Sequence, residues 1–547
     1  MVHPPVFWLY NFNVTNKQER RNYQLLDAVS PYITRDEPFG PIDSVDIDSS
    51  DLTALKLLFE VHNWTYKNLR TRPSIIIGRR GSGKTCYLRS VFFDKQYDFY
   101  TEIRTARVLG HMARVIERMA DSAVFSEMVS DLWDMVLWIS LFFEIRKTPI
   151  LSEDERYVVD TYLENVNVHH AGNVDDVLWN IANLLDETMR DMPDGDASNA
   201  LRGSDRITFD YVKSVVTNSL TRSKKTFVVL MDSLDDFQLD VDSVSRSLQG
   251  LLKLVGSMNK PRDVVDIRFC MPAEIYHRFI KISSNPNKDF RRALKLQWTA
   301  AELLLLGAQR LMFYLALYYP AFLKTISPLD LTKRNDALKL FQAVFPERII
   351  NQAGFQEETM SYILRHTQLL PRHFLMLLNS IFKNPNDMEK ATPFPISGDR
   401  IINGIRQVEE FMIGEIFVAF NPTYPTAEAT CKRCLSELGH KFSMGDLHRV
   451  FTRHGKAVFG SDNLFDFQRM LLEIGAIGRV IKGKETDLYI KGNFEYTVSH
   501  EMALGQDDEL CVHPLFSGIF RGGGGQDRPV YPYGSVLDDG DYREIED

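Results

Sequence analysis

Short runs of consecutive apolar residues alternate with longer stretches of helical periodicity along much of the chain. The runs that resemble buried strands lie at Ser74–Ile77, Thr226–Met231, Val264–Met271 and Leu294–Trp298. A strand that is buried on both faces is apolar throughout, whereas a strand with one solvated face alternates. Buried strands that alternate with helices predict an α/β fold with a parallel sheet.

Apolar residues recur every three to four positions between these runs, which indicates amphipathic helices. The pattern covers 51–66, 102–160, about 174–190 and 208–219, and it returns over 301–420. The helical stretch between about 102 and 220 is far longer than a loop. We therefore interpret it as a helical insertion or as additional βα units.

The character of the sequence changes again near residue 426. Helical segments at 430–439, 444–453 and 464–473 precede a strand-like run at 476–481, a charged turn and a second strand at 488–490. Three helices followed by a β-hairpin is the order of a winged-helix domain. Basic and acidic residues are interleaved here, so internal packing and nucleic-acid binding both remain open.

The segment after the first strand run carries the pattern G-x-x-x-x-G-K-[ST]. Glycines let the backbone curl so that successive N–H groups face an anion. The lysine reaches the β and γ phosphates, and the hydroxyl of the last residue ligates Mg²⁺. Strand, loop and helix follow in the order that a phosphate loop (P-loop) requires. The pattern predicts that ATP and Mg²⁺ are bound by Gly78, Gly81, Ser82, Gly83, Lys84 and Thr85.

A second cluster of candidate residues follows the run Thr226–Met231. Asp232 stands where a buried parallel strand ends, and such an edge is where open α/β sheets place their ligands. Its carboxylate is a candidate magnesium ligand, alongside Thr85. Asp235 and Asp236 are candidates for polarising the attacking water. Acidic residues are also favoured at a helix N-terminus, which is the alternative interpretation of this cluster.

The motifs and composition shifts divide the chain into five predicted parts. These are an N-terminal arm (1–45), a P-loop NTPase core with the helical insertion (46–300), a helical lid (301–425), a winged-helix domain (426–500), and a C-terminal segment with a flexible acidic tail (501–547). The length of 547 residues is ample for several domains.

Composition narrows the class of protein without identifying it. Hydrophobic residues make up 44% and charged residues 25% of the chain, which is typical of globular proteins. The formal net charge of −9 argues against a strongly basic nucleic-acid-binding surface over the whole chain. Five cysteines and the absence of a recognisable secretory signal or clean membrane span predict a cytoplasmic protein without a membrane partner.

The P-loop together with the strand that ends in Asp232 resembles the ATPases of the AAA+ and STAND kind, including KAP-like ATPases of bacterial defence loci. The resemblance implies a regulatory ATPase that forms a homo-oligomer or acts on an effector protein. One position departs from the pattern. These families usually have an acidic residue directly after the magnesium-binding aspartate, whereas this chain has Ser233. Slow hydrolysis is the implied consequence if no nearby acid substitutes.

The resemblance also implies roles for three arginines. Leu370-Pro371-Arg372 is similar to the start of the sensor-2 helix, whose arginine reaches the γ-phosphate. Arg291 and Arg292 fall where assembling members place an arginine finger. The alternatives are a solvent-facing residue for Arg372 and solvated helix-end cations for the pair. The segment Cys270–Glu274 falls where sensor 1 belongs, but it has none of the usual residues for that role.

Three functions remain open from the sequence. The first is an ATPase that uses nucleotide-dependent closure or assembly to control a partner, with anti-phage defence as the implied setting. The second is an initiator or loader that binds DNA through the winged helix. The third is a weakly hydrolysing scaffold that nucleotide stabilises.

Overall fold

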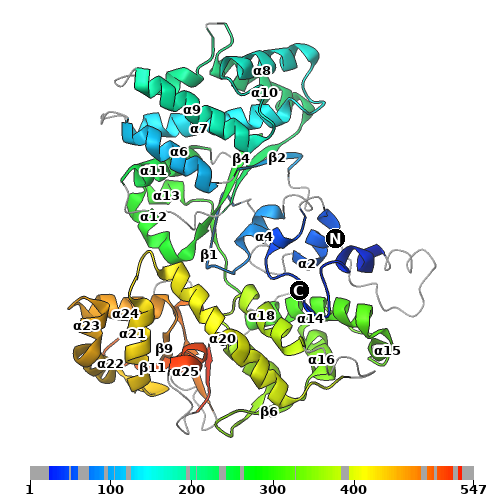
Figure 1. The fold of residues 1–547 in the computed structure, drawn as a ribbon, viewed down its shortest axis with the longest axis vertical. Coiled ribbons are helices and arrows are strands. Elements are labelled where there is room, and N and C mark those ends of the chain that lie inside the picture. The colour runs from blue at the N-terminus through cyan, green and yellow to red at the C-terminus, as the bar shows by residue number, and fades with distance from the viewer. Residues whose placement is uncertain are drawn as a thin grey trace. The chain divides into compact units, whose positions relative to one another are not determined.

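A computed structural model describes residues 24–48, 51–59, 73–90, 97–103, 105–118, 125–191, 197–204, 206–232, 242–258, 264–326, 328–383, 393–481, 489–497, 502–520 and 528–532. The chain forms two compact units. The sheet unit comprises Leu69–Gly78 and Lys84–Leu296, and the terminal unit comprises Met1–Asn68, Arg79–Gly83 and Gln297–Asp547. Figure 1 shows the elements of both.

The sheet unit is built on a parallel five-stranded sheet with the order β2-β3-β4-β1-β5. The strands are β1 (Ile75–Gly78), β2 (Phe99–Ile103), β3 (Phe227–Met231), β4 (Val265–Pro272) and β5 (Ala293–Lys295). Every residue of β1 and β3 is buried, as the apolar runs predict. The predicted α/β fold with a parallel sheet is confirmed.

The edge strand β2 is the one strand of this parallel sheet that the sequence does not reveal. Its residues alternate between partly exposed and buried positions, and Tyr100 is 47% exposed. An edge strand with one solvated face lacks the continuous apolar run that marks β1 and β3. Helical periodicity was therefore predicted from about residue 102, whereas the strand extends to Ile103.

The helical insertion joins the neighbouring parallel strands β2 and β3. Figure 1 shows α6, α7 and α9 side by side in this part of the chain. Trp133 of α7 is fully buried, and its Nε1–H donates to the carbonyl of Ser247 on α11 over 2.9 Å. A Cβ at Gly250 would lie 2.4 Å from Cγ1 of Val129, so glycine permits this close helix packing. The helices of the sheet unit are α4 (Lys84–Arg89), α6 (Thr105–Arg118), α7 (Phe125–Ile145), α8 (Glu153–Asn165), α9 (Val174–Asp191), α10 (Phe209–Ser223), α11 (Asp242–Ser257), α12 (Tyr276–Ile282) and α13 (Pro286–Asp289).

The terminal unit is mainly helical up to residue 420. Its longest apolar helix is α14, and this is the one described helix long and apolar enough to cross a membrane. Most of that helix (72% of the tested window) is buried inside the structure, as in a core helix. The helices of this part are α2 (Leu52–Phe59), α14 (Ala300–Tyr318), α15 (Pro320–Leu323), α16 (Arg334–Val344), α17 (Thr359–Arg365), α18 (Pro371–Phe382) and α20 (Gly398–Phe420).

A second five-stranded sheet, with the order β12-β10-β9-β11-β8, organises the C-terminal region (Ala427–Pro532). One helix, a short strand that the sequence does not predict, three helices and the antiparallel pair β9–β10 follow one another along the chain, and the turn at 482–488 lies outside the described residues. The sheet also takes in β11 and β12, from the segment that the sequence separates as a C-terminal tail. The elements are α21 (Ala427–Cys434), β8 (Lys441–Ser443), α22 (Met444–Val450), α23 (Lys456–Phe459), α24 (Leu464–Glu473), β9 (Ile477–Val480), β10 (Ile490–Asn493), β11 (Glu509–Val512), α25 (Pro514–Phe520) and β12 (Val530–Pro532).

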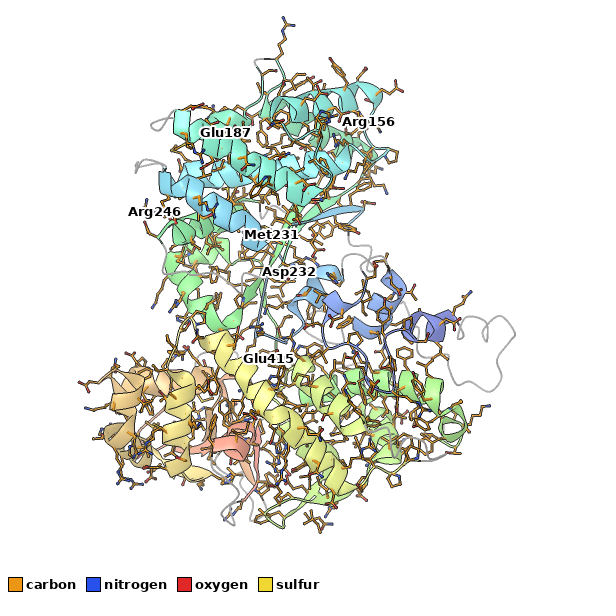
Figure 2. The ribbon with its side chains drawn as sticks, in the orientation of Figure 1. Arg156, Glu187, Met231, Asp232, Arg246 and Glu415 are labelled. Atoms are coloured by element: carbon orange, nitrogen blue, oxygen red, sulfur yellow. The ribbon has the colours of Figure 1, made fainter. Side chains whose placement is uncertain are left out.

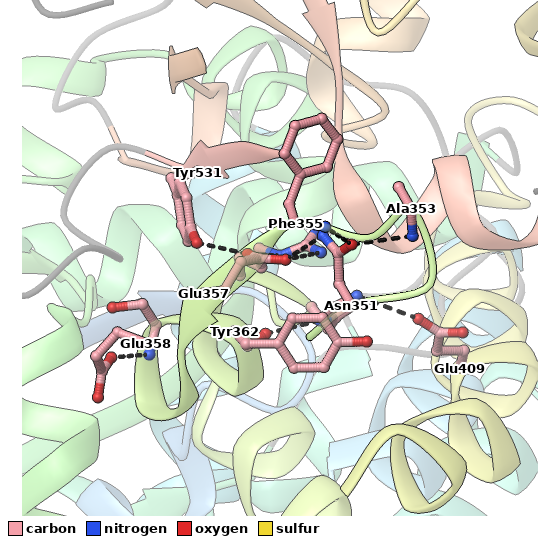
Figure 3. Close-up of polar contacts among 11 residues, drawn as sticks. Asn351, Ala353, Phe355, Glu357, Glu358, Tyr362, Glu409 and Tyr531 are labelled. Carbon is pink, nitrogen blue, oxygen red and sulfur yellow. Dashed lines mark hydrogen bonds and ion pairs between the residues drawn. The ribbon is translucent and has the colours of Figure 1, made fainter. Parts of the chain in front are cut away.

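The strand β12 is fastened by a buried polar cluster (Figure 3). The hydroxyl of Tyr531 donates to Glu357 on the hairpin of β6 (Arg348–Ile350) and β7 (Gln356–Glu358). Asn351 Nδ2 donates to the same carboxylate over 2.6 Å, and Arg365 forms an ion pair with it at 2.9 Å. Because Glu357 is 3% exposed, its charge requires these partners.

Another buried carboxylate in this region, Glu409 of α20, has a less complete environment. It is 8% exposed, and its Oε1 lies 3.7 Å from Nε2 of His366. Burial raises the pKa of Glu409 to about 7, while Arg365 and Arg406 act in the opposite direction. Burial also lowers the pKa of His366 well below its usual value, so the histidine supplies no charge near neutrality.

We expect Glu409→Gln to stabilise the protein at alkaline pH. A carboxyl whose pKa is raised by folding stabilises the fold while protonated, and that contribution is lost as the pH rises through about 7. The variant should therefore be more stable than wild type at pH 8.5, by up to about 3 kcal/mol, and close to wild type at pH 4, below the ordinary pKa of a glutamate. Melting curves at both pH values test this. An equal difference at both pH values would contradict the assignment.

The side chain of Arg310 anchors the N-terminal part of the chain to α14. The guanidinium is 1% exposed and donates to the carbonyls of Phe39, Pro41 and Leu58 over 2.6–2.8 Å. It also lies 4.7 Å from the ring centroid of Phe59. One buried cation therefore donates to three backbone carbonyls from two separate parts of the chain.

We expect Arg310→Met to lower the melting temperature strongly, because three buried carbonyls lose their donor. Removing a hydrogen-bonded partner from a buried site of this kind costs about 3–5 kcal/mol. Scanning calorimetry of the variant measures the effect. The matched control is Arg190→Met on the exposed face of α9, which should stay within about 0.5 kcal/mol of wild type. Equal melting of the two variants would refute the anchoring role.

Candidate nucleotide-binding site

The phosphate loop occupies the turn between the end of β1 at Gly78 and the start of α4 at Lys84. Gly81 has φ +82° and Gly83 has φ +87°. Side chains other than glycine are strained in this left-handed region. The two motif glycines therefore give the backbone the curl that the sequence predicts.

The loop is packed on residues of its own unit. Trp298 Nε1–H donates to the carbonyl of Ser82 over 2.9 Å. The backbone N–H of Arg372 donates to the carbonyl of Gly81 over 3.3 Å. Both contacts use carbonyl groups of the loop. The N–H of Ser82 donates to the carbonyl of Arg79 within the loop, over 3.0 Å.

The structure brings together the two predicted magnesium ligands. Asp232 follows Met231 at the carboxyl end of β3 (Figure 2). The hydroxyl of Thr85 lies 3.2 Å from Asp232 Oδ1 and 3.5 Å from Oδ2. A hydroxyl and a carboxylate are the hard oxygen donors that Mg²⁺ prefers, so these residues fit the metal. Lys84, directly before Thr85, is 6% exposed.

The sheet topology explains why Thr85 and Asp232 lie close together. β4 lies between β1 and β3 and is parallel to both, so all three strands end at the same edge. Gly78 is in register with Pro272, and Met231 is in register with Phe269. Residues directly after β1 and β3 therefore emerge close together, although a long stretch of sequence separates them.

Asp235 and Asp236 lie outside the described residues, as does Ser233. A different buried acid stands near the same sheet edge. Glu274 follows the end of β4 in a 3₁₀ turn and is 5% exposed. Its segment was compared with sensor 1 in sequence, but nothing in the local pattern marks the glutamate. The burial of its charged side chain is what marks Glu274 as a candidate, and burial can be recognised only in the folded structure.

Arg372 of the terminal unit is held by two carboxylates. It lies in the first turn of α18, and its guanidinium pairs with Asp43 and, at 3.2 Å, with Glu415 of α20. Its side chain is 15% exposed, so it is not the solvent-facing residue of the alternative interpretation. The role implied for Arg372 at the γ-phosphate remains a proposal.

The two arginines before β5 have different environments. Arg292 donates from both terminal nitrogens to Asp266, over 3.3 and 2.8 Å. Tyr97 donates to the same carboxylate over 2.6 Å. Arg291 is exposed. Of this pair, Arg291 is therefore the one whose side chain could reach a neighbouring molecule without first breaking the part-buried ion pair with Asp266.

No group of three or more His, Cys, Asp or Glu residues that could hold a metal ion occurs among the described residues. Cys431 and Cys434 are both buried, and burial raises the pKa of the Cys434 thiol to about 11. Both side chains belong to the buried face of α21.

Comparisons with known proteins add little to this geometry. No protein-family model and no curated protein matches the chain. Among solved structures, the chain is similar to the ORC2 protein of Aeropyrum pernix in ADPNP–ADP complexes. The sequence identity is 12% and the TM-score is 0.32, over 81% of this chain and 84% of that chain. This likeness is too low to carry an argument, so the conclusions rest on the residues and their geometry.

We expect Asp232→Asn to weaken magnesium-dependent nucleotide binding by roughly 10–100-fold, because an amide is a poorer magnesium ligand than a carboxylate. Titration with a non-hydrolysable ATP analogue in Mg²⁺ and in EDTA measures the effect. The difference between wild type and variant should vanish in EDTA. Asp186→Asn on α9 is the control and should bind as wild type. A variant that bound equally well in Mg²⁺ would remove Asp232 from the metal site.

Proposed function

We propose that this protein is an ATP-binding and ATP-hydrolysing regulatory ATPase that controls a partner through nucleotide-dependent rearrangement or assembly. The contact between Thr85 and Asp232 carries the proposal. Three features meet at this contact: a P-loop sequence, a curled loop with two glycines in the left-handed region, and an acid at the end of a parallel strand. Chance similarity to a P-loop would not supply the second strand and its carboxylate.

Each residue of the loop has a distinct task in this proposal. Backbone amides of Gly81, Ser82 and Gly83 would bind phosphate oxygens, for which the Ser82 amide must give up its hydrogen bond to the Arg79 carbonyl. The Lys84 ammonium would neutralise the β and γ phosphates. Thr85 and Asp232 would hold Mg²⁺, which offsets negative charge on the transferring phosphoryl group. Positioning and charge stabilisation supply most of the catalysis in such reactions.

The acid that orients the attacking water is the open part of the proposal. Asp235 and Asp236 are the candidates from sequence, and the buried Glu274 is the candidate from structure. Arg372 is the proposed γ-phosphate sensor, and Arg291 with Arg292 the proposed finger in an assembled state. Slow turnover, and hence a nucleotide-stabilised scaffold, follows if none of the acids reaches the water.

The C-terminal region bears on whether the partner is a protein or DNA. Its described basic side chains are largely engaged with acids on the same surface. Paired cations lose attraction for phosphate, because each contact must first break an ion pair. We therefore favour an effector protein or a second copy of the chain over nucleic acid as the partner. The order of helices and hairpin in this region is compatible with both kinds of partner. The pairs are Lys441–Glu509, Arg449–Asp446, Arg453–Glu437, His454–Glu437, Lys456–Asp462, Arg469–Glu473 and Arg479–Asp508.

A bacterial defence role and a cytoplasmic location belong to the same proposal. The defence role comes from the sequence resemblance to AAA+ and STAND ATPases. The location comes from the cysteine content and from the absence of a recognisable secretory signal or clean membrane span, and the five free cysteines and the burial of α14 agree with it.

We expect Lys84→Ala to abolish detectable ATP binding and phosphate release, because the loop loses the cation that faces the β and γ phosphates. Isothermal titration calorimetry with Mg-ATP and a phosphate-release assay measure the two effects. The control is Lys225→Ala, whose lysine pairs with Asp98 on the exposed edge of the sheet. Unchanged ATP affinity in Lys84→Ala would defeat the proposed function.

A further inference from the structure

The side chain of Arg79 has no assigned task in the phosphate loop. Arg79 is the first residue after β1, at one of the four variable positions of the motif. The phosphate chemistry of the motif uses backbone amides, the lysine and the hydroxyl, so it does not explain an arginine here. The structure shows that this side chain points instead at the C-terminal region.

Two aromatic rings and one carbonyl hold the guanidinium of Arg79. Its Cζ lies 5.4 Å from the ring centroid of Phe420 and 5.5 Å from that of Tyr496. A terminal nitrogen donates to the carbonyl of Ile474 over 3.4 Å. Rings within about 6 Å attract a cation through their quadrupole, and the attraction grows when water is excluded. The three partners come from the end of α20, the turn after α24 and the segment after β10.

The turn that supplies the carbonyl is shaped for this contact. Gln368 Nε2 also donates to the carbonyl of Ile474, over 2.8 Å. Gly475 follows with φ +74°, and a Cβ there would lie 2.7 Å from Gln368 Nε2 and 3.1 Å from Tyr496. Glycine is therefore required both by the backbone conformation and by the closeness of these side chains.

The hydroxyl of Tyr496 is held in place by a hydrogen bond with His513. The hydroxyl oxygen lies 2.7 Å from Nε2 of His513, which is fully buried. The N–H of Leu515 donates to Nδ1 of the same ring over 3.1 Å. Because Nδ1 accepts a hydrogen bond, the neutral imidazole carries its proton on Nε2 and donates it to the tyrosine oxygen. Arg79 thus contacts a ring that is itself anchored next to β11 and α25.

We propose that Arg79 is a positioning residue that couples the phosphate loop to the C-terminal region. The inference rests on the proposed function, because nucleotide is the ligand that would move the loop. Amides that converge on a phosphate shift the loop, and Arg79 transmits the shift to Ile474 and Tyr496. Coupling is reciprocal, so the packing of these residues also changes nucleotide affinity.

The variant Arg79→Ala tests the coupling by hydrogen–deuterium exchange. With a non-hydrolysable ATP analogue and Mg²⁺, wild type should show altered exchange at 472–480 and 490–497. Arg79→Ala should still bind the analogue, because Lys84, Thr85 and Asp232 are retained, yet its exchange in these segments should no longer respond. Its affinity should differ from wild type by about 5-fold or more, as coupling energies of this kind produce.

Conservative variants separate positioning from simple loss of structure. Arg79→Lys keeps a cation and should restore part of the response. Tyr496→Phe keeps the ring and should retain it, whereas Tyr496→Leu removes the ring and should lose it. Arg80→Ala, at the exposed neighbouring position, is the matched control and should respond as wild type.

The outcomes distinguish this inference from the function on which it rests. Wild type that binds no nucleotide in calorimetry would overturn both. Wild type that binds nucleotide, with an unchanged exchange response in Arg79→Ala and Tyr496→Leu, would overturn the coupling alone. If Arg79→Ala does not fold, the two tyrosine variants decide the question by the same measurement.

Discussion

The account depends on one constraint: parallel strands that pair in register end at the same edge of the sheet. β1 delivers Thr85 to this edge through the phosphate loop, and β3 delivers Asp232. β4 separates the two strands and fixes their relative register through backbone hydrogen bonds. A hydroxyl and a carboxylate that are remote in sequence therefore lie within hydrogen-bonding distance of each other. Such preorganisation lowers the cost of binding a metal and its phosphates.

Contacts made by arginine side chains hold several segments of the terminal unit together. Arg310 ties backbone carbonyls of the N-terminal part to α14, and Arg372 joins Asp43 to α20. Arg79 connects the phosphate loop with the rings of Phe420 and Tyr496 and with the carbonyl of Ile474. A guanidinium is suited to this because its planar fork has five donors and its face stacks on rings. Loops without regular secondary structure are thereby held in defined positions.

Much of the sheet unit could be predicted from the sequence, because a strand buried on both faces leaves a continuous apolar run. β1 and β3 follow this rule, and the glycines of the loop report its backbone conformation directly. β2 could not be found, because an edge strand alternates and blends into the helical pattern beyond it. Glu274 and the acid partners of Arg372 could not be found either. Burial of a charge is a property of the fold, and so is pairing between residues far apart in sequence, such as Asp43 and Arg372, so neither leaves a local pattern.

A structure determined with a non-hydrolysable ATP analogue and Mg²⁺ tests the central claim most directly. The account predicts that the triphosphate lies against the backbone amides of Gly81–Lys84, with the metal next to Thr85 Oγ1 and the carboxylate of Asp232. A triphosphate bound elsewhere, or a loop that leaves Thr85 and Asp232 without the metal, would contradict it.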